Sequence, residues 1–284
     1  DKVGRYIKVP LDAYEIDLEG AHIYPGFIDG WFEVKKDEKT VSPDDHWNNK
    51  IKANYRAKDD LKIKEEDLKA LRALGLTAVH IIPEEGIFKG KSDLVMLDND
   101  FKSIKKDVAQ IIDFKTTGWS DRSYPNSLLG AMALIRQTFM DADWYYNSTQ
   151  IVTKYPEQNP LIPFHPSLSE LSDFRLNRKP ILFVTKEEHG ALRSLKIADE
   201  FNLNPWILGS GYEYRRLNLI AELNPFIIFP LDFPAKPKVK DPYVALQYST
   251  EQLKHWDMAP DNILKVFDKG LRFSLTSGLS LIHI

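Results

Sequence analysis

The stretch AHIYPGFIDGWFE, residues 21–33, predicts where the chain enters its first buried strand. Pro25 and Gly26 favour a turn, and the apolar residues on either side of them are typical of a strand. Asp29 stands at the predicted end of that strand, where we expect its carboxylate to accept hydrogen bonds from backbone N–H groups. A folded domain is therefore predicted to begin at about residue 23.

Similar apolar runs recur along the chain, separated by Gly/Pro breaks and by segments with helical periodicity. Several are apolar on both faces, as parallel strands are when helices cover one side and packed side chains the other. The fold class predicted is α/β, as a (β/α)8 TIM-like barrel with one parallel sheet. Its eight strands are HIYPGFID, TAVHIIP, SDLVML, AQIIDF, PILFVT, PWILGS, PFIIFP and RFSLT. The segment GIFKGKSDLVML also fits a local hairpin.

Helices are predicted between these runs from their caps and their apolar stripes. KEEDLKALRALG, residues 64–75, has acids in its first turn and ends at a glycine, and residues 126–146 form a long amphipathic segment. STEQLKHW, residues 249–256, opens with a capping box. PDNILKVFDKG, residues 260–270, is predicted as a separate helix that Pro260 begins.

The composition excludes several classes of function. A net charge of −3 and a pI near 6.2 give no electrostatic reason to expect a nucleic-acid partner. No apolar run approaches the roughly 18–20 residues that cross a bilayer, so we expect no membrane insertion. The chain has 0 cysteines, which rules out disulfides, thiolate metal ligands and cysteine nucleophiles.

Three regions of the chain are predicted to differ in role. Residues 1–22 alternate polar and apolar pieces, as exposed β strands do, and residues 23–277 form the barrel. Residues 278–284 follow the last strand without a helix or cap, which favours a truncation or a non-native tail, and so a fragment of a longer polypeptide. Two proline-rich stretches, residues 147–165 and 230–243, are predicted to be ordered loops.

The order of these segments resembles a known family. YPGFID, ALRALGLTAVHIIPEEGIFKGKSDLVML and PILFVTKEEHGALRSLKIADEFNL resemble the amidohydrolase superfamily, in particular its imidazolonepropionase-like branch. YPNSLLGAMALIRQTFMDADWYY is similar to the amino-terminal module of bacterial proteins that carry two amidohydrolase-like modules in tandem. The resemblance implies a metal-dependent hydrolase barrel with an accessory β-sandwich, of which residues 1–22 would be a remnant. It also implies a periplasmic or envelope location, although the sequence itself leaves the compartment open.

Active members of this superfamily hold divalent metals at the carboxyl ends of their strands. The ligands are an HxH pair after strand one, histidines after strands five and six, and an aspartate after strand eight. The resemblance places those ligand positions at Trp31, Glu33, Thr185, Gly209 (or Ser210) and Ser277, none of which is the family's residue. We therefore expect the metal site to be lost and no cofactor to be bound, with a divalent metal such as zinc as the alternative.

A replacement site is the second possibility, because carboxylates gather at the predicted strand ends. An all-oxygen cluster would suit magnesium, calcium or manganese, and a carboxyl pair with separated pKa values would serve as acid and base. Polar loops facing water and acids in a helix's first turn explain the same residues without a site. The acids in question are Asp29, Glu33, Glu84, Glu85, Glu187, Glu188 and Asp232. The candidate catalytic residues are Asp29, Glu33, Glu187 and His189.

The remaining motifs are weaker. The histidines form no metal-binding spacing, and His80, inside a strand, is predicted to be a hydrogen-bonded core residue. GSGYE, residues 209–213, fits a phosphate cradle or, more simply, a tight strand-to-helix turn. Tyr145 and Tyr146 are candidates for an interface.

Three hypotheses follow from the sequence. In the first, the chain is a non-catalytic barrel, a pseudoenzyme module, that supports a catalytic amidohydrolase module on the same polypeptide. In the second, it is an active hydrolase of C–N bonds in cyclic amides or peptides that uses a rebuilt carboxylate site. In the third, it is a barrel that binds a ligand without turnover.

Overall fold

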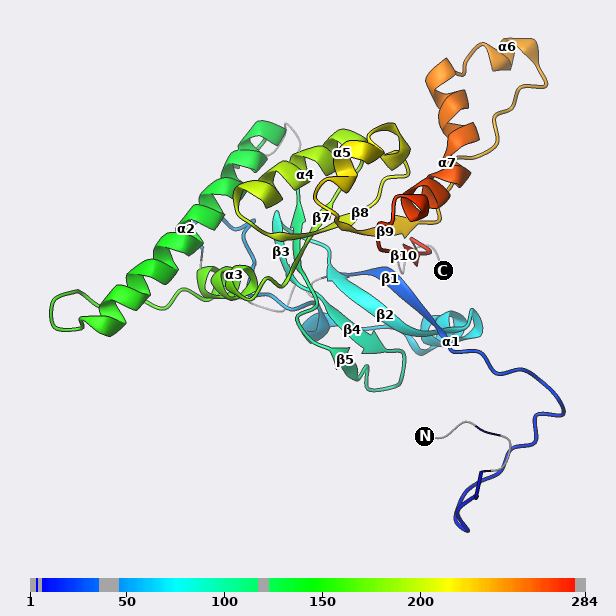
Figure 1. Cartoon of the computed structure of the whole chain (residues 1–284), viewed down its shortest axis with the longest axis horizontal. Helices are drawn as coiled ribbons and strands as arrows, with labels where there is room; N and C mark the ends of the chain where they lie inside the picture. Colours follow the sequence, from blue (N-terminus) through cyan, green and yellow to red (C-terminus); the bar gives the residue numbers. More distant parts are fainter. Residues whose placement is uncertain (1–3, 5–6, 36–45, 117–122, 279–284) are drawn as a thin grey trace.

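The computed structural model describes residue 4 and residues 7–35, 46–116 and 123–278, whose strands fall into two sheets (Figure 1). One sheet has the order β1 (Phe27–Val34), β2 (Leu76–Pro83), β4 (Asp93–Met96) and β5 (Ser103–Lys105). The other has the order β10 (Phe273–Thr276), β9 (Phe226–Pro230), β8 (Asn204–Leu208), β7 (Pro180–Val184), β6 (Gln110–Asp113) and β3 (Phe88–Lys91). Neighbouring strands from β6 to β10 are parallel, as are β1 and β2.

The predicted parallel direction of SDLVML was wrong. This segment is β4, which runs antiparallel to β2 and then forms a hairpin with β5, while β3 runs antiparallel to β6. The reason is connectivity, because a parallel crossover needs a dozen or more residues and usually a helix. No helix lies between β2 and β6 among the described residues. The other seven apolar runs all contain a strand.

The helices follow the local signals, with two corrections. Five of the described helices are α1 (Glu65–Ala73), α3 (Pro166–Leu176), α4 (Glu188–Glu200), α5 (Leu217–Ala221) and α6 (Pro242–Ala245). Two short 3-10 turns, η1 (Ala57–Asp60) and η2 (Glu213–Arg215), are also present. α2 (Leu128–Lys154) continues into the stretch predicted as a loop from residue 147, because no glycine or proline interrupts the chain before Pro156. α7 (Thr250–Asp268) is one helix that continues through Pro260, although its predicted capping box at Ser249 and Gln252 is present.

Alternate residues of the strands pack into different cores. Ile112, Ile181 and Phe183 contact the side covered by α2, α3 and α4, in one buried cluster. Their neighbours Ile111 and Leu182 pack instead with residues of the other sheet in a second cluster. This inner cluster, named from its position between the sheets, consists of Trp31, Ile82, Ala109, Ile111, Leu182 and Ile228. The inner cluster therefore fills the space between the two sheets, and α2, α3 and α4 cover the opposite face of the six-stranded sheet.

On one side, the sheets are joined through Ser92. Its backbone N–H donates to the Ala109 carbonyl over 2.9 Å, and its side-chain oxygen accepts from the Ala109 N–H over 3.0 Å. The ring of His80 bridges Ser92 Oγ at 2.7 Å and the Gly30 carbonyl at 3.1 Å. The prediction of His80 as a hydrogen-bonded core residue is confirmed. We call these contacts the His80 seam.

On the other side, β1 lies against β10 through Asp29. Its Oδ1 accepts hydrogen bonds from the Trp31 N–H at 3.0 Å and from Thr276 Oγ1 at 2.5 Å. Gly30 permits the close approach, because a Cβ there would lie 3.0 Å from Ser274 Oγ and 3.2 Å from the Leu275 carbonyl oxygen. We call these contacts the Asp29 seam.

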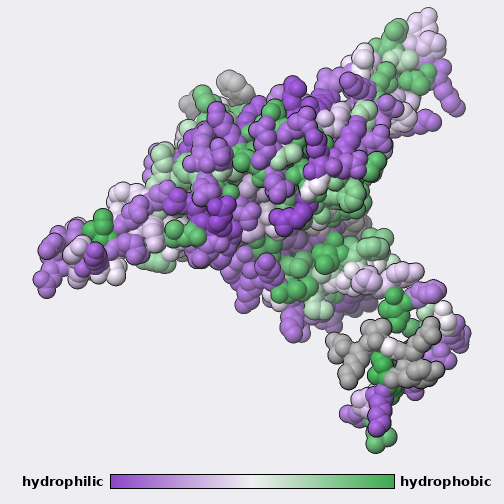
Figure 2. All heavy atoms as spheres, viewed as in Figure 1, coloured by the Kyte–Doolittle hydropathy of each residue, from purple (hydrophilic) through white to green (hydrophobic). Residues whose placement is uncertain are grey.

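The segment before β1 extends away from both sheets (Figure 1). Residues 7–26 form no strand in the described structure, so the accessory β domain stays a prediction. Their apolar side chains are exposed, and Figure 2 shows hydrophobic atoms along this segment and on the arm that carries α6. The predicted non-native tail lies, apart from Gly278, outside the described residues. None of the described helices is both long and apolar enough to cross a bilayer.

Candidate functional site

A cluster of charged side chains lies where the parallel strands end. Lys89 of β3 places its ammonium 3.1 Å from Asp113 Oδ2 of β6 and 3.8 Å from Glu33 Oε1 of β1. The side chains of Lys89 and Asp113 are only 3% and 6% exposed, whereas Glu33 is 31% exposed. We call Glu33, Lys89 and Asp113 the charged cluster.

The alternation of the strands explains why these side chains meet. Asp113 stands two residues after Ile111 and Glu33 two residues after Trp31, so each follows an inner-cluster residue on the same face of its strand. Phe88 contacts the core beneath α2, and the adjacent Lys89 therefore turns to the opposite, inner face. The cluster is thus the polar end of the inner cluster.

Burial dominates the electrostatics of Glu33. Desolvation raises the pKa of its carboxyl above the ordinary value, and the nearby carboxylates of Glu84 and Asp113 raise it further. The ammonium of Lys89 acts against them without cancelling the rise. Glu33 is consequently a carboxyl that holds its proton more readily than a surface glutamate does.

Asp29, the first candidate from the sequence, is buried and fully engaged. Besides its bonds to Trp31 and Thr276, its Oδ2 accepts a hydrogen bond from the hydroxyl of Ser277 and lies 3.4 Å from the Ser277 N–H. The expected bond from a backbone N–H is therefore present, and two side-chain hydroxyls add to it. Both carboxylate oxygens serve the Asp29 seam.

Glu187 and His189 lie apart from the charged cluster. Glu187 precedes α4 and pairs with Arg193 of the same helix at 2.9 Å, while the side chain of His189 is exposed. Neither forms a hydrogen bond or ion pair with Glu33 or Asp29 within the described residues. The structure brings together one of the four sequence candidates, Glu33, with two residues that the sequence did not single out.

The other acids have separate partners or surroundings. Glu85 pairs with Lys52 at 3.0 Å on the surface, and buried Glu188 pairs with Arg215 at 3.3 Å. Asp232 is exposed, and Glu84 influences the pKa of Glu33. The seven acids therefore do not form one cluster, although Glu33 and Glu84 influence each other.

The positions where the family has metal ligands are filled by residues with structural bonds. Trp31 is buried in the inner cluster, and Thr185 donates its hydroxyl to the Leu208 carbonyl at 2.6 Å. A side chain at Gly209 would be crowded, because a Cβ there would lie 3.1 Å from Phe229 Cδ1 and 3.3 Å from the Ile228 carbonyl oxygen. At the alternative position, Ser210 Oγ lies 3.0 Å from the buried carboxylate of Glu213.

These residues do not fit a divalent metal. At the positions where the resemblance places imidazole and carboxylate donors, the chain has an indole, a glycine, and threonine and serine hydroxyls that are already bonded. The carboxylates of Glu33 and Asp113 lie close together, but the ammonium of Lys89 is 3.8 Å from the first and 3.1 Å from the second and already supplies a positive charge. In the parts of the chain that the structure describes, no group of three or more His, Cys, Asp or Glu side chains could hold a metal ion.

The turn GSGYE is closed by its own side chain. Glu213 Oε1 accepts the Ser210 N–H at 2.6 Å, so a backbone donor that a phosphate would need is already in use. This contact favours the tight-turn interpretation.

Comparison with known proteins identifies one similarity, and it is structural. No family model matches the chain, and no curated protein matches it. The crystal structure of an amidohydrolase from Thermotoga maritima MSB8 superimposes with a TM-score of 0.76, covering 99% of this chain and 72% of that one, at 20% sequence identity. Sequence identity at this level shows a shared fold. The chain therefore has the fold of an amidohydrolase.

Proposed function

We propose that this chain is a non-catalytic amidohydrolase-type barrel that supports a catalytic amidohydrolase module on the same polypeptide. The observation that carries the proposal is the position of Lys89 between Asp113 and Glu33. In this proposal the lysine ammonium replaces the metal ion, because it neutralises the same kind of buried carboxylate without creating a Lewis acid.

The proposal includes closure of the two sheets into one distorted (β/α)8 barrel. The Asp29 seam supports closure, since it joins the edge strand β1 of the four-stranded sheet to the edge strand β10 of the six-stranded sheet. The His80 seam also supports closure, since Ser92, between β3 and β4, bonds both to His80 of β2 and to Ala109, which directly precedes β6. The inner cluster supports it as well, because its residues come from both sheets. Trp31 then fills the barrel end where a metal-binding imidazole would otherwise point.

The exposed apolar residues support a role in association. Within residues 7–18 they occupy every second position in two short runs, 7–11 and 14–18, a pattern that buries one face of each strand when a partner sheet is present. They are Ile7, Val9, Leu11, Tyr14, Ile16 and Leu18. In this proposal the partner is the catalytic amidohydrolase module on the same polypeptide. The proposal also places this chain in the imidazolonepropionase-like branch of the superfamily.

Metal analysis and turnover test the proposal together. We expect the purified chain to hold far less than stoichiometric zinc or manganese and to hydrolyse neither cyclic amides nor dipeptides when either metal is added. Stoichiometric metal that is lost together with activity in Glu33→Ala would overturn it. In addition, removal of this chain is expected to lower the melting temperature of the catalytic module on the same polypeptide, which differential scanning calorimetry measures.

One observation favours the alternative, an active hydrolase of C–N bonds. Glu33 combines a raised pKa with partial exposure, which are the properties of a general acid–base residue. This alternative predicts turnover that Glu33→Gln abolishes while the protein stays folded. The same hydrolysis assays therefore decide between the two functions.

A further inference from the structure

The helix α7 is fixed to the body of the molecule by one of its faces. Val266 on this face is fully buried in a cluster with Ile227 and Phe229 of β9. Asn262, on the same face, is 1% exposed, and its amide donates a hydrogen bond to the buried carboxylate of Glu213 over 2.7 Å. The rest of the helix surface is therefore held in a defined position.

A second apolar face of α7 is exposed. Its residues recur at intervals of three or four positions, which places them in one line along a helix of 3.6 residues per turn. At 1.5 Å per residue, the line is about 21 Å long. Its members, all exposed, are Leu253, Trp256, Pro260, Leu264 and Phe267. We call these residues the α7 stripe.

The α7 stripe is more apolar surface than a surface helix usually presents to water. Such a helix has one apolar face toward the core and polar residues on the opposite side. In α7 the apolar surface continues around the helix, from buried Val266 through half-buried Ile263 to Phe267, which is 64% exposed. A contiguous exposed apolar surface of this kind is typical of a site of association.

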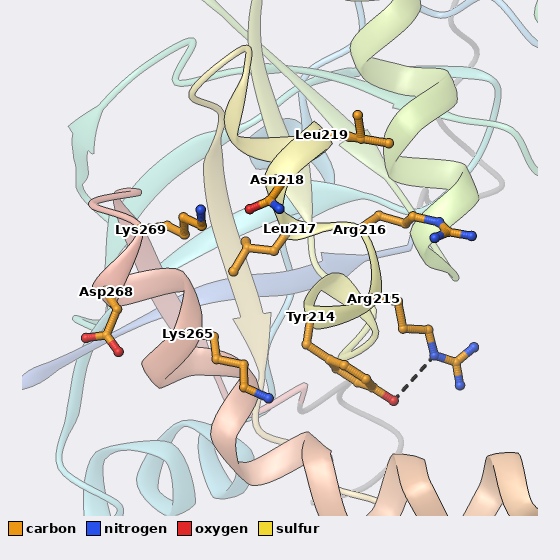
Figure 3. Close-up of a pocket in the computed structure, with 9 residues that line it drawn as sticks. All are labelled: Tyr214, Arg215, Arg216, Leu217, Asn218, Leu219, Lys265, Asp268 and Lys269. Atoms are coloured by element: carbon orange, nitrogen blue, oxygen red, sulfur yellow. Dashed lines mark hydrogen bonds between the residues drawn. The ribbon is translucent and has the colours of Figure 1, made fainter.

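Carboxylates border the α7 stripe along one edge. Asp257, Asp261 and Asp268 each directly follow a stripe residue, so they share the same side of it. All three are exposed, and none forms an ion pair with any described residue. Lys265 does not neutralise this edge, because its ammonium lies 5.6 Å from the centre of the Tyr214 ring, and Figure 3 shows it directed toward that ring while Asp268 points the other way.

This combination of apolar and acidic residues discriminates between possible occupants. A membrane surface with anionic lipids would repel the acidic edge. In an antiparallel pair of α7 helices from two copies of this chain, equivalent edges meet, so the two rows of carboxylates would face each other and repel. A different helix, with an apolar stripe and a row of lysine or arginine residues beside it, is complementary in both respects.

We propose that the α7 stripe docks an amphipathic helix of a partner polypeptide whose apolar face is bordered by lysine or arginine residues. The apolar residues of the partner cover the stripe, and its cations pair with Asp257, Asp261 and Asp268. The proposal does not depend on the proposed function, because the stripe includes no residue of the charged cluster or of the inner cluster.

Fluorescence anisotropy of the full chain with a labelled synthetic helix tests the proposal. The probe has leucine at every third or fourth position and lysine on both sides of this row, and a second probe has glutamate in place of each lysine. We expect saturable binding of the lysine probe and binding of the glutamate probe that is at least about tenfold weaker.

Substitutions on α7 locate the binding. Leu264→Ser and Phe267→Ser should each weaken binding of the lysine probe about tenfold. Asp261→Lys should weaken the lysine probe and strengthen the glutamate probe. The matched control is Phe164→Ser, a phenylalanine outside the stripe that is 75% exposed, which should change neither affinity. Far-ultraviolet circular dichroism verifies that each variant is folded.

Four results would overturn the proposal. They are the absence of saturable binding, equal affinities for the two probes, a loss in Phe164→Ser as large as in Phe267→Ser, and a wild-type dimer in analytical ultracentrifugation that Phe267→Ser dissociates. The last result would mean that a second copy of this chain covers the stripe. Since none of these substitutions changes Glu33, Lys89 or Asp113, failure here leaves the proposed function untouched.

Discussion

Replacing Lys89 by methionine is the most direct perturbation of the charged cluster. Methionine keeps the length and apolar stem of the side chain but removes the ammonium that lies 3.1 Å from Asp113. At an effective dielectric constant of about 20, a pair at this distance attracts by about 5 kcal/mol before desolvation is considered. Leaving a buried carboxylate without its partner costs about 3–5 kcal/mol in comparable sites.

We therefore expect Lys89→Met to lower the free energy of unfolding by about 3–5 kcal/mol, which corresponds to roughly 10 °C in melting temperature for a chain of this length. Urea denaturation followed by circular dichroism measures the first quantity and calorimetry the second. The double variant Lys89→Met/Asp113→Asn removes both charges and should recover most of the loss. Lys52→Met serves as the control, because the Lys52–Glu85 pair has a carboxylate that is 62% exposed, and its loss should stay below about 1 kcal/mol.

The argument fails if Lys89→Met costs no more than Lys52→Met. It also fails if the double variant is as unstable as the single one, because the unpaired Asp113 carboxylate would then not be the source of the loss.

Three further predictions concern the same end of the molecule. Burial lowers the pKa of His80 to about 4 from 6.5. As the pH falls, the unfolded protein therefore binds a proton at His80 before the folded protein does, and the free energy of unfolding should fall by roughly 3 kcal/mol between pH 7 and pH 4. Urea titrations should show this dependence in the wild type but not in His80→Asn. Burial raises the pKa of the Glu33 carboxyl in the folded protein. Ionisation of Glu33 therefore lowers the free energy of unfolding above this folded-state pKa and has no effect below the pKa of the unfolded protein. Glu33→Gln should be more stable than the wild type at neutral pH, with the difference vanishing below about pH 4, and a larger difference in acid would refute the raised pKa. Trp31→Ala should cost about 3–5 kcal/mol if the indole fills the inner cluster, whereas a loss under about 1 kcal/mol in thermal unfolding would mean that the space is not packed.

Local signals in the sequence predicted local structure well. The capping box at Ser249 is present because it involves only residues one helical turn apart. Apolar runs predicted the positions of the strands, since a strand that is buried on both faces has apolar residues at nearly every position. His80 was predicted correctly for the same reason.

Features that depend on distant residues were missed. Whether β4 runs parallel or antiparallel is decided by its pairing with β2, which its own residues do not encode. Lys89 and Asp113 are 24 residues apart in sequence and meet because β3 pairs with β6. A lysine directly after Ile87 and Phe88 was the available signal, because a lysine that becomes buried requires a carboxylate partner. The residues at the positions where the resemblance places the family's ligands could be checked one by one in the sequence, whereas the proximity of Lys89 to Asp113 and Glu33 required the fold.

The two seams divide the molecule into parts that can open separately. Ladders of backbone hydrogen bonds hold each sheet together, whereas at the Asp29 seam a single carboxylate and two hydroxyls join β1 to β10. Fluctuations short of global unfolding should therefore begin there, with β1, β2, β4 and α1 moving as one cooperative unit. In native-state hydrogen exchange, the amides of β7 and β8 would be the slowest, and Asp29→Asn would speed exchange in β1 and β10 while leaving those central strands protected.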